Sequence, residues 1–164
     1  MEENSYKKLS KFGQELLTST ELEEGLPLIA KYANDIIGSA RCSIFIYDNK
    51  KNILWTTLAD GIEKIIIDYC DGIVGQSLKT KEIIIENSVD NNPSFLSIID
   101  EDSGFKTKNI ICSPIIGSHN EAIGVLELLN KEDGFTKEDE KFMKLFTGFI
   151  SSFIELAPRT FKFK

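Results

Sequence analysis

The stretch NIICSPIIGSHNEAIGVLELLNKEDGFTKEDE, residues 109–140, decides the fold of this chain. Two apolar runs, residues 110–116 and 122–129, flank the polar turn sequence GSHNE at 117–121. Apolar runs of this length on either side of a short turn predict an antiparallel β-hairpin. Both faces of the second run are mostly apolar, so we expect a central strand that is covered on both sides.

Glu127 interrupts the apolar pattern of the second run. Strand alternation predicts that one face of this run carries Ile123, Val125, Glu127 and Leu129. A carboxylate on a face that is otherwise apolar has two interpretations, because burying a charge without partners is costly. The position is either a sheet edge that is open to water or the floor of a ligand pocket.

The composition is typical of one acidic globular domain. The chain has 164 residues, of which 41% are apolar and 27% charged, and a formal net charge of −7. Such a balance repels phosphate backbones and anionic lipids, so we expect no nucleic-acid partner and no membrane surface. The sequence shows neither the apolar core of a signal peptide nor an apolar run of membrane-spanning length, which predicts a cytoplasmic protein.

The cysteines and the histidine do not form a catalytic or metal-binding pattern. Cys42, Cys70 and Cys112 include no C-x-x-C pair, so the sequence predicts neither a disulfide framework nor a zinc site. His119 is the only histidine and lies in the hairpin turn, where no Ser-His-Asp arrangement can be assembled. We therefore predict no catalytic residue, no metal and no cofactor, and we do not expect an enzyme.

Periodicity and turn signals predict the remaining elements. The first helix is expected over residues 5–18. The second is expected to start at Thr20, which forms a capping box with Glu23, and to end at Gly38. We expect this second helix to kink or to restart at Pro27. The other predicted elements are strands at 41–47, 52–58, 63–68 and 82–86, a short helix at 72–79, a helical turn at 93–98 inside a long polar connection, and a last helix capped by Thr136.

This order of elements predicts an α+β fold with one mainly antiparallel six-stranded sheet. The long N- and C-terminal helices would cover one face, and the short helices and a lid-like connection the other. We assign residues 1–18 to an N-terminal helix, 19–157 to a single domain and 158–164 to a tail. The last helix has more apolar surface than one core-facing stripe needs, which predicts a homodimer formed through the first and last helices.

Four blocks of sequence resemble the GAF domain, and most closely the cyclic-nucleotide-binding GAF modules of phosphodiesterases and adenylyl cyclases. Three blocks are RCSIFI at 41–46, GIVG at 72–75 and DSGFKTKNIICSPI at 102–115. The fourth is the family signature N-K-x(n)-F-x(3)-D-E, which stands here as Asn130, Lys131, Phe135, Asp139 and Glu140. The likeness extends over residues 19–156 and implies the GAF fold.

The resemblance also implies a ligand pocket beneath the short helix and the lid. The positions that match the family's ligand-binding residues are Ser43, Asp60, Ile73, Val74, Asp100, Ser103, Thr107 and Glu127. The resemblance implies that Ser43 and Asp60 contact the base of a cyclic nucleotide. It also implies that the backbone of Ile73 and Val74 lies beside that nucleotide. The N-termini of short helices can hold the phosphate without an arginine, because their free N–H groups and dipole attract anions.

The leading hypothesis is a regulatory sensor that binds cyclic AMP or cyclic GMP under a lid. Its terminal helices would then act on an output domain or a partner protein. A dimerisation scaffold with an unused pocket is the alternative, because Ala59 and Leu96 stand where the family's cyclic GMP binders have aromatic residues. Reduction of free methionine sulfoxide, known in some GAF proteins, would need a cysteine within the GIVG block, and that block has none.

The signature itself has a structural interpretation as well. Lys131 and Asp139 are spaced to pair between the last strand and the last helix, with Phe135 packed beneath the turn. On this hypothesis the signature braces the fold and contacts no ligand.

Overall fold

The computed structural model describes residues 3–19, 21–56, 65–93 and 104–157. The helices are α1 (Glu3–Leu17), α2 (Leu22–Ile37), α3 (Gly72–Thr80) and α5 (Lys137–Leu156), with a 3₁₀ turn, η1, at Val89–Asn91. The strands are β1 (Ser39–Asp48), β2 (Ile53–Thr56), β3 (Ile65–Asp68), β4 (Ile84–Glu86), β5 (Ile110–Ile116) and β6 (Ala122–Lys131). They form one sheet in the order β3-β2-β1-β6-β5-β4 with antiparallel neighbours, which confirms the predicted α+β architecture.

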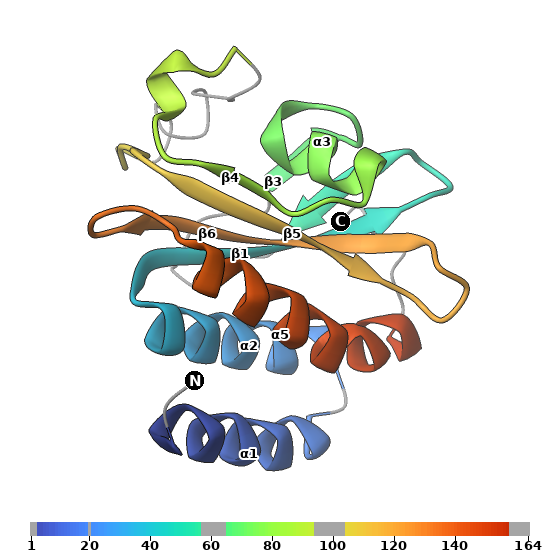
Figure 1. The fold of residues 1–164 in the computed structure, drawn as a ribbon. Coiled ribbons are helices and arrows are strands. Elements are labelled where there is room, and N and C mark those ends of the chain that lie inside the picture. Colours follow the sequence, from blue (N-terminus) through green and yellow to red (C-terminus); the bar gives the residue numbers. More distant parts are fainter. Residues whose placement is uncertain (1–2, 20, 57–64, 94–103, 158–164) are drawn as a thin grey trace.

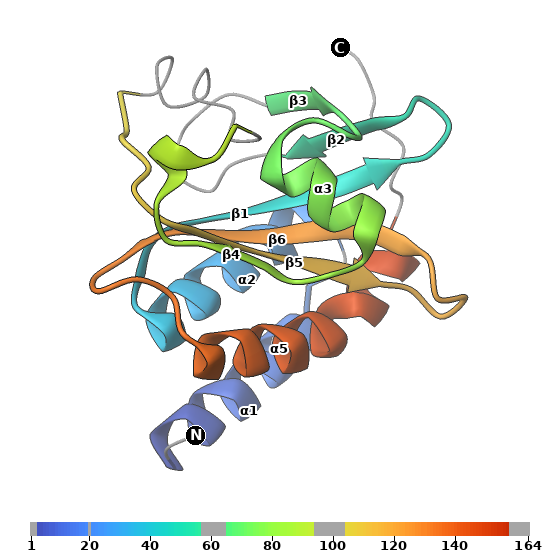
Figure 2. The same ribbon diagram turned by 45° about the horizontal axis from the view of Figure 1, so that its top comes forward.

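The elements are stacked in four layers (Figure 1). The helices α2 and α5 cover one face of the sheet, α1 packs on the outer side of these two helices, and α3 lies over the opposite face (Figures 1 and 2). Phe12 fixes α1 in place, since its ring centroid lies 5.0 Å from that of Tyr32 and 5.2 Å from that of Phe146. The first helix therefore forms the outermost layer of the helical side (Figure 1).

Two apolar cores lie on the two faces of the sheet. The larger, the helix-side core, includes Ile29, Ile44, Ile111, Leu126 and Phe146. The smaller, the α3-side core, consists of Phe45, Leu54, Ile73, Val74, Leu78, Val89, Ile110, Cys112 and Val125. Because β1, β5 and β6 contribute to both cores, their apolar runs are nearly continuous, as expected of strands covered on both sides.

The hairpin predicted around the turn at 117–121 is present, but its second strand contains a bulge. Ile115 pairs with Gly124 and Ile116 pairs with Ala122, so Ile123 is an extra residue in β6. The bulge turns Ile123 into the helix-side core, whereas Val125 faces the α3 side. The prediction that Ile123 shares a face with Val125 and Glu127 is therefore wrong.

The second helix differs from its prediction at its start. The helix begins at Leu22 with Glu21 as its N-cap, so the expected capping box at Thr20 does not start it, and Thr20 itself lies outside the described residues. Of the two alternatives expected at Pro27, a restart is excluded, because a single helix continues through Pro27 to Ile37. Its C-terminal end is as predicted, since Gly38 adopts a φ of 84° and donates its backbone N–H to the Asn34 carbonyl at 2.7 Å.

The last helix matches its prediction closely. The Thr136 hydroxyl accepts the backbone N–H of Asp139, and the Asp139 carboxylate accepts the backbone N–H of Thr136, which completes a capping box. Among the described residues, no helix is both long enough and apolar enough to cross a membrane.

Parts of the other predictions fall outside the described residues. These are the strand ends at 57–58 and 63–64, most of the expected helical turn at 93–98, and the tail at 158–164. The 3₁₀ turn η1, which lies within the long connection, was not predicted from the sequence.

Candidate functional site

A row of three side chains crosses the face of the sheet that α3 covers. Ser43 on β1 pairs with Glu127 on β6, which in turn pairs with Cys112 on β5. All three are buried, and only 9% of Glu127 is exposed. Because β6 lies between β1 and β5, the sheet-edge interpretation of Glu127 is excluded.

Glu127 places a carboxyl group in this row, on a surface that is mainly apolar. Burial raises the pKa of the Cys112 thiol well above its usual value, and the nearby Glu127 carboxylate raises it further. The register of β5 and β6 places the carboxyl group directly across from the thiol. Cys112 therefore stays protonated near neutral pH.

The GIVG block forms the first turn of α3 and holds this helix close to the chain that precedes it. Gly72 has a φ of 69°, a conformation that glycine adopts readily. A Cβ on Gly75 would overlap the backbone carbonyl carbon of Cys70, so only glycine allows this approach. The backbone conformation at Gly72 and the close packing at Gly75 therefore explain why both positions are glycine.

Ile73 and Val74 anchor α3 with their side chains rather than with their backbone. Both side chains are buried in the α3-side core, at 2% and 6% exposure. The N–H groups of a first helical turn have no partner within the helix and form its positive end. The first turn of α3 thus presents a potential anion-binding backbone on the side of the sheet that carries Glu127.

The structure locates five of the eight predicted ligand-binding residues. Ser43 and Glu127 are neighbours across β1 and β6, Ile73 and Val74 belong to the helix over the same face, and Thr107 is buried at 2% exposure after the long connection. The other three predicted residues, Asp60, Asp100 and Ser103, lie outside the described residues.

The signature residue Asn130 fixes the C-terminal end of the long connection. Its Oδ1 accepts the backbone N–H of Lys108 at 2.7 Å and that of Asn109 at 3.3 Å, and its Nδ2 donates to the Lys106 carbonyl at 2.8 Å. Asn130 adopts a φ of 57°, which asparagine tolerates better than most residues. This side chain therefore joins the end of β6 to the segment that leads into β5.

Asn87 fixes the N-terminal end of the same connection. Its Oδ1 accepts the backbone N–H of Phe135 at 2.8 Å, and its Nδ2 donates to the Phe135 carbonyl at 3.1 Å. Both ends of the connection are thus hydrogen-bonded to the signature stretch. Sequence reasoning missed Asn87, because nothing in a lone asparagine indicates a partner so far along the chain.

Lys131 and Asp139 form the predicted pair between the last strand and the last helix. The Lys131 ammonium donates to both carboxylate oxygens of Asp139 at 2.7 Å, and Phe135 is buried in the helix-side core. Glu140 pairs with Lys137 at 2.8 Å and lines a separate cavity of about 330 Å³ beside β5 and α5. The Lys131–Asp139 pair and Phe135 brace the junction of strand and helix, whereas the Lys137–Glu140 pair lies within the first turn of α5.

Thr56, at the end of β2, is a polar residue that sequence reasoning did not single out. It is 1% exposed, and its hydroxyl has no hydrogen-bond partner. Threonine is common in strands, so its type gave no signal. Strand alternation alone would place it with Leu54 on the α3 side.

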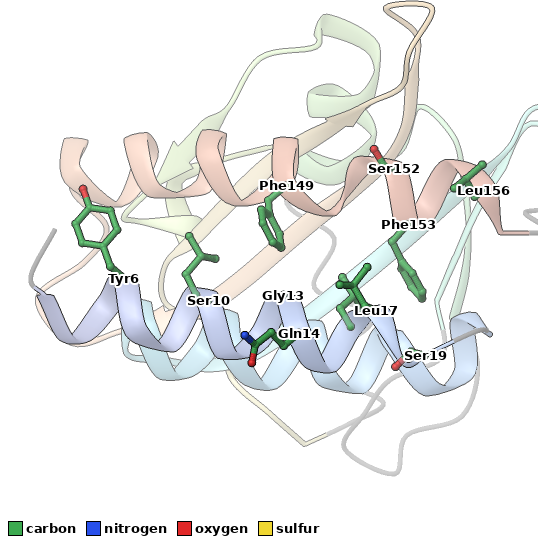
Figure 3. Close-up of a pocket in the computed structure, with 12 residues that line it drawn as sticks. Tyr6, Ser10, Gly13, Gln14, Leu17, Ser19, Phe149, Ser152, Phe153 and Leu156 are labelled. Atoms are coloured by element: carbon green, nitrogen blue, oxygen red, sulfur yellow. The ribbon is translucent and has the colours of Figure 1, made fainter.

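An apolar groove runs between α1 and α5 on the helical side of the molecule (Figure 3). Its volume is about 680 Å³, and Phe149 and Phe153 of α5 line it opposite Leu17 of α1. Leu17 and Leu156 are 87% and 88% exposed. The apolar excess predicted for the last helix is therefore present at the surface.

Two groups of potential metal ligands occur in the described part of the chain. The ligand atoms of Asp68, Cys70 and Asp71 lie within 4.8 Å of one another, as do those of His119, Glu121 and Glu155. The Cys70 thiol donates to the Asp68 carboxylate at 2.9 Å, which raises the pKa of the thiol. Neither group includes a residue of the row that contains Glu127.

Comparison with known proteins identifies relatives over most of the chain. A GAF domain family model matches residues 21–154. The probable 3′,5′-cyclic phosphodiesterase pde-5 of Caenorhabditis elegans is 29% identical over 134 residues, which is 72% of this chain and 18% of that protein. The cGMP-specific 3′,5′-cyclic phosphodiesterase of Drosophila virilis is 33% identical over 101 residues, which is 58% of this chain and 11% of that protein.

A solved structure supports the same fold. The GAF domain of a phosphoenolpyruvate-protein phosphotransferase from Coxiella burnetii superposes with a TM-score of 0.80 at 20% identity, over 93% of each chain. At this level of identity the likeness concerns the fold alone. The chain spans less than a fifth of the length of the two phosphodiesterases it matches.

Proposed function

Because the chain belongs to the GAF domain family, we propose that it is a regulatory module that binds cyclic AMP or cyclic GMP on the sheet face beneath α3. The observation that carries this proposal is the buried Glu127 carboxylate, which lies next to Ser43 on a face that is otherwise apolar. A carboxylate at this position can accept hydrogen bonds from the N–H or O–H groups of a ligand bound on the same face.

The chemistry of the face suits a cyclic nucleotide. A carboxylate accepts hydrogen bonds from the N–H groups of a purine edge, and a serine hydroxyl can either donate or accept. The first turn of α3 offers backbone N–H groups and a positive dipole end to a single phosphate charge. The apolar residues Phe45, Leu54 and Val125 of the same core suit the flat faces of a base.

The names of the relatives refer to the same class of ligand. One relative is a cGMP-specific phosphodiesterase, although the chain matches only a small part of it. In this proposal the ligand acts on the terminal helices, because the Lys131–Asp139 pair joins the ligand-facing strand β6 to the first turn of α5. An output domain or a partner protein would respond to that helix.

Isothermal titration of the purified protein with cyclic AMP and with cyclic GMP tests the proposal. We expect saturable binding of at least one nucleotide and a tenfold or greater loss of affinity in Glu127→Gln, since one charge-assisted hydrogen bond contributes about 1.5–3 kcal/mol. Glu138→Gln is the matched control, because the Glu138 side chain is 78% exposed at the start of α5. Binding of neither nucleotide would contradict the proposal.

The groove between α1 and α5 favours a second candidate function, a dimerisation scaffold. Leu17 and Leu156 expose nearly all of their apolar surface beside this groove. Pairing of two copies through these helices would bury that surface. The two candidates differ in one result, because a scaffold with an unused pocket forms dimers and binds no nucleotide.

A further inference from the structure

In the described part of the chain, two buried side-chain atoms lack a hydrogen-bond partner, Thr56 Oγ1 and one carboxylate oxygen of Glu121, and Thr56 is the one on the α3 side of the sheet. Its Oγ1 is buried and has no hydrogen-bond partner. Burying a hydroxyl without a partner costs free energy, so such a group in a folded protein needs an explanation. Two other buried hydroxyls are satisfied within the fold: Ser77 donates to the Glu82 carbonyl at 2.7 Å, and Thr147 donates to the Met143 carbonyl at 2.9 Å.

The position of Thr56 connects it to the row that contains Glu127. Leu54 belongs to the α3-side core and Trp55 to the helix-side core, so alternation places Thr56 on the α3 side. On β3 its pairing partner is Ile65. On β1, the register that pairs Ile46 with Trp55 brings Phe45 opposite Thr56.

Ser43 lies two residues from Phe45 on the same face of β1. Thr56 and Ser43 are therefore diagonal neighbours on adjacent strands, a relation that corresponds to a separation of about 7–8 Å. Glu127 lies directly across from Ser43. Three buried polar groups thus lie near one another on a face of the sheet that is otherwise mainly apolar.

We infer that Thr56 is a ligand-contacting residue, and that a purine base supplies the hydrogen-bond partner that its hydroxyl lacks in the unliganded protein. A hydroxyl both donates one hydrogen bond and accepts others, and a purine edge offers ring nitrogens that accept and amino or N–H groups that donate. The apolar neighbours Phe45 and Ile65 flank the hydroxyl on either side. This inference rests on the proposed function and adds a third polar contact to it.

Thermal unfolding of the ligand-free protein tests whether the Thr56 hydroxyl lacks a hydrogen-bond partner. Thr56→Val keeps the shape of the side chain and removes the hydroxyl. We expect its melting temperature to equal or exceed that of the wild type, because an unpartnered buried group is lost. Thr147→Val is the matched control and should melt at a lower temperature, since the Thr147 hydroxyl is bonded to Met143 and Ser113. A similar fall for both variants would mean that Thr56 already has a partner, such as a buried water, and would overturn the inference.

Titration with cyclic GMP and cyclic AMP tests whether a bound nucleotide supplies that partner. Thr56→Val should bind the preferred nucleotide about three- to tenfold more weakly than the wild type, which corresponds to one hydrogen bond. Thr56→Ser keeps the hydroxyl and should stay within about twofold of the wild type. Unchanged affinity in Thr56→Val would overturn the inference while leaving the proposed function intact. A wild-type protein that binds neither nucleotide would contradict both the proposed function and the claim that a purine base contacts Thr56. The unfolding comparison would still decide whether the hydroxyl is unpaired.

Discussion

The Lys131 ammonium contacts both carboxylate oxygens of Asp139 at 2.7 Å, and this pair joins the end of β6 to the first turn of α5. Asp139 also completes the capping box with Thr136, so one carboxylate serves both the ion pair and the start of the helix. The strand that carries Glu127 is thereby connected to the helix that borders the apolar groove.

Lys131→Met should lower the free energy of unfolding by about 1–3 kcal/mol, because it leaves the buried Asp139 carboxylate without its cation. The loss stays below that of a fully buried pair because the Lys131 side chain is 24% exposed and Asp139 keeps its bonds to Thr136. Urea unfolding measures the change. Lys137→Met is the control and should change stability by less than about 0.5 kcal/mol, since its own pair with Glu140 is exposed. Equal effects of the two variants would contradict the bracing role.

Asn130→Ala should loosen the chain that leads into β5. The variant removes the acceptor for the Lys108 and Asn109 amides and the donor to the Lys106 carbonyl. We expect faster hydrogen exchange at residues 106–109 than in the wild type, because exchange follows local opening. Asn49→Ala, in the exposed turn after β1, should leave exchange at these residues unchanged. Wild-type exchange rates in Asn130→Ala would show that this anchor does not hold the segment.

Two glycine-to-alanine variants should have opposite effects. Gly75→Ala places a Cβ against the Cys70 backbone, which cannot move aside, and should destabilise the protein by about 2–3 kcal/mol. Gly148→Ala lies within α5, where nothing is within 4 Å of the added Cβ, and should stabilise the protein by about 0.5–1 kcal/mol. Chemical unfolding measures both changes. The packing described for α3 is wrong if Gly75→Ala is tolerated as well as Gly148→Ala.

The stability of the protein should decline at alkaline pH in a way that depends on Cys112. The pKa of this thiol is raised by burial and by Glu127, so the folded state keeps its proton where the unfolded chain releases it. The contribution of Cys112 is therefore fully present below the ordinary thiol pKa of about 8.5 and is lost as the pH rises above it.

Urea unfolding between about pH 7 and pH 10 measures this decline. Cys112→Ala lowers stability at neutral pH by leaving a cavity, but its stability should fall less steeply with rising pH than that of the wild type. Parallel curves for the two proteins would mean that the thiol titrates normally in the folded state.

Leu17→Glu and Leu156→Glu should weaken self-association without unfolding the protein. Both side chains are almost fully exposed beside the groove, so a charge there costs the monomer little and opposes burial in a dimer. Sedimentation velocity should detect dimers of the wild type that dissociate in these variants. Asn49→Glu adds the same charge in the β1–β2 turn and should remain dimeric. A monomeric wild type would exclude the proposed pairing of terminal helices.

The fold was predictable because its signals are local. Alternating and continuous apolar runs marked the strands, and Thr136 with Asp139 marked the start of α5. The bulge at Ile123 was not predictable, because one extra residue in an apolar run changes neither composition nor turn signals. The continuity of α2 through Pro27 depends on packing against neighbouring elements, which a single sequence does not show.

From the residue pattern alone, without the family resemblance, the candidate site was predictable only where a residue broke the pattern around it. Glu127 did so, since a carboxylate is rare within a buried strand. Thr56 did not, because threonine suits strands and only the structure reveals that its hydroxyl lacks a partner. The anchors Asn87 and Asn130 act through hydrogen bonds between segments that are far apart in sequence, and such contacts follow from the fold rather than from any local motif.

The most direct test of the central claim is a crystal structure of the protein grown with cyclic GMP or cyclic AMP. The account predicts nucleotide density on the sheet face beneath α3, with the base within hydrogen-bonding distance of the Glu127 carboxylate. Density for the nucleotide at any other place, or a face beneath α3 that stays closed by side chains at saturating nucleotide, would contradict it.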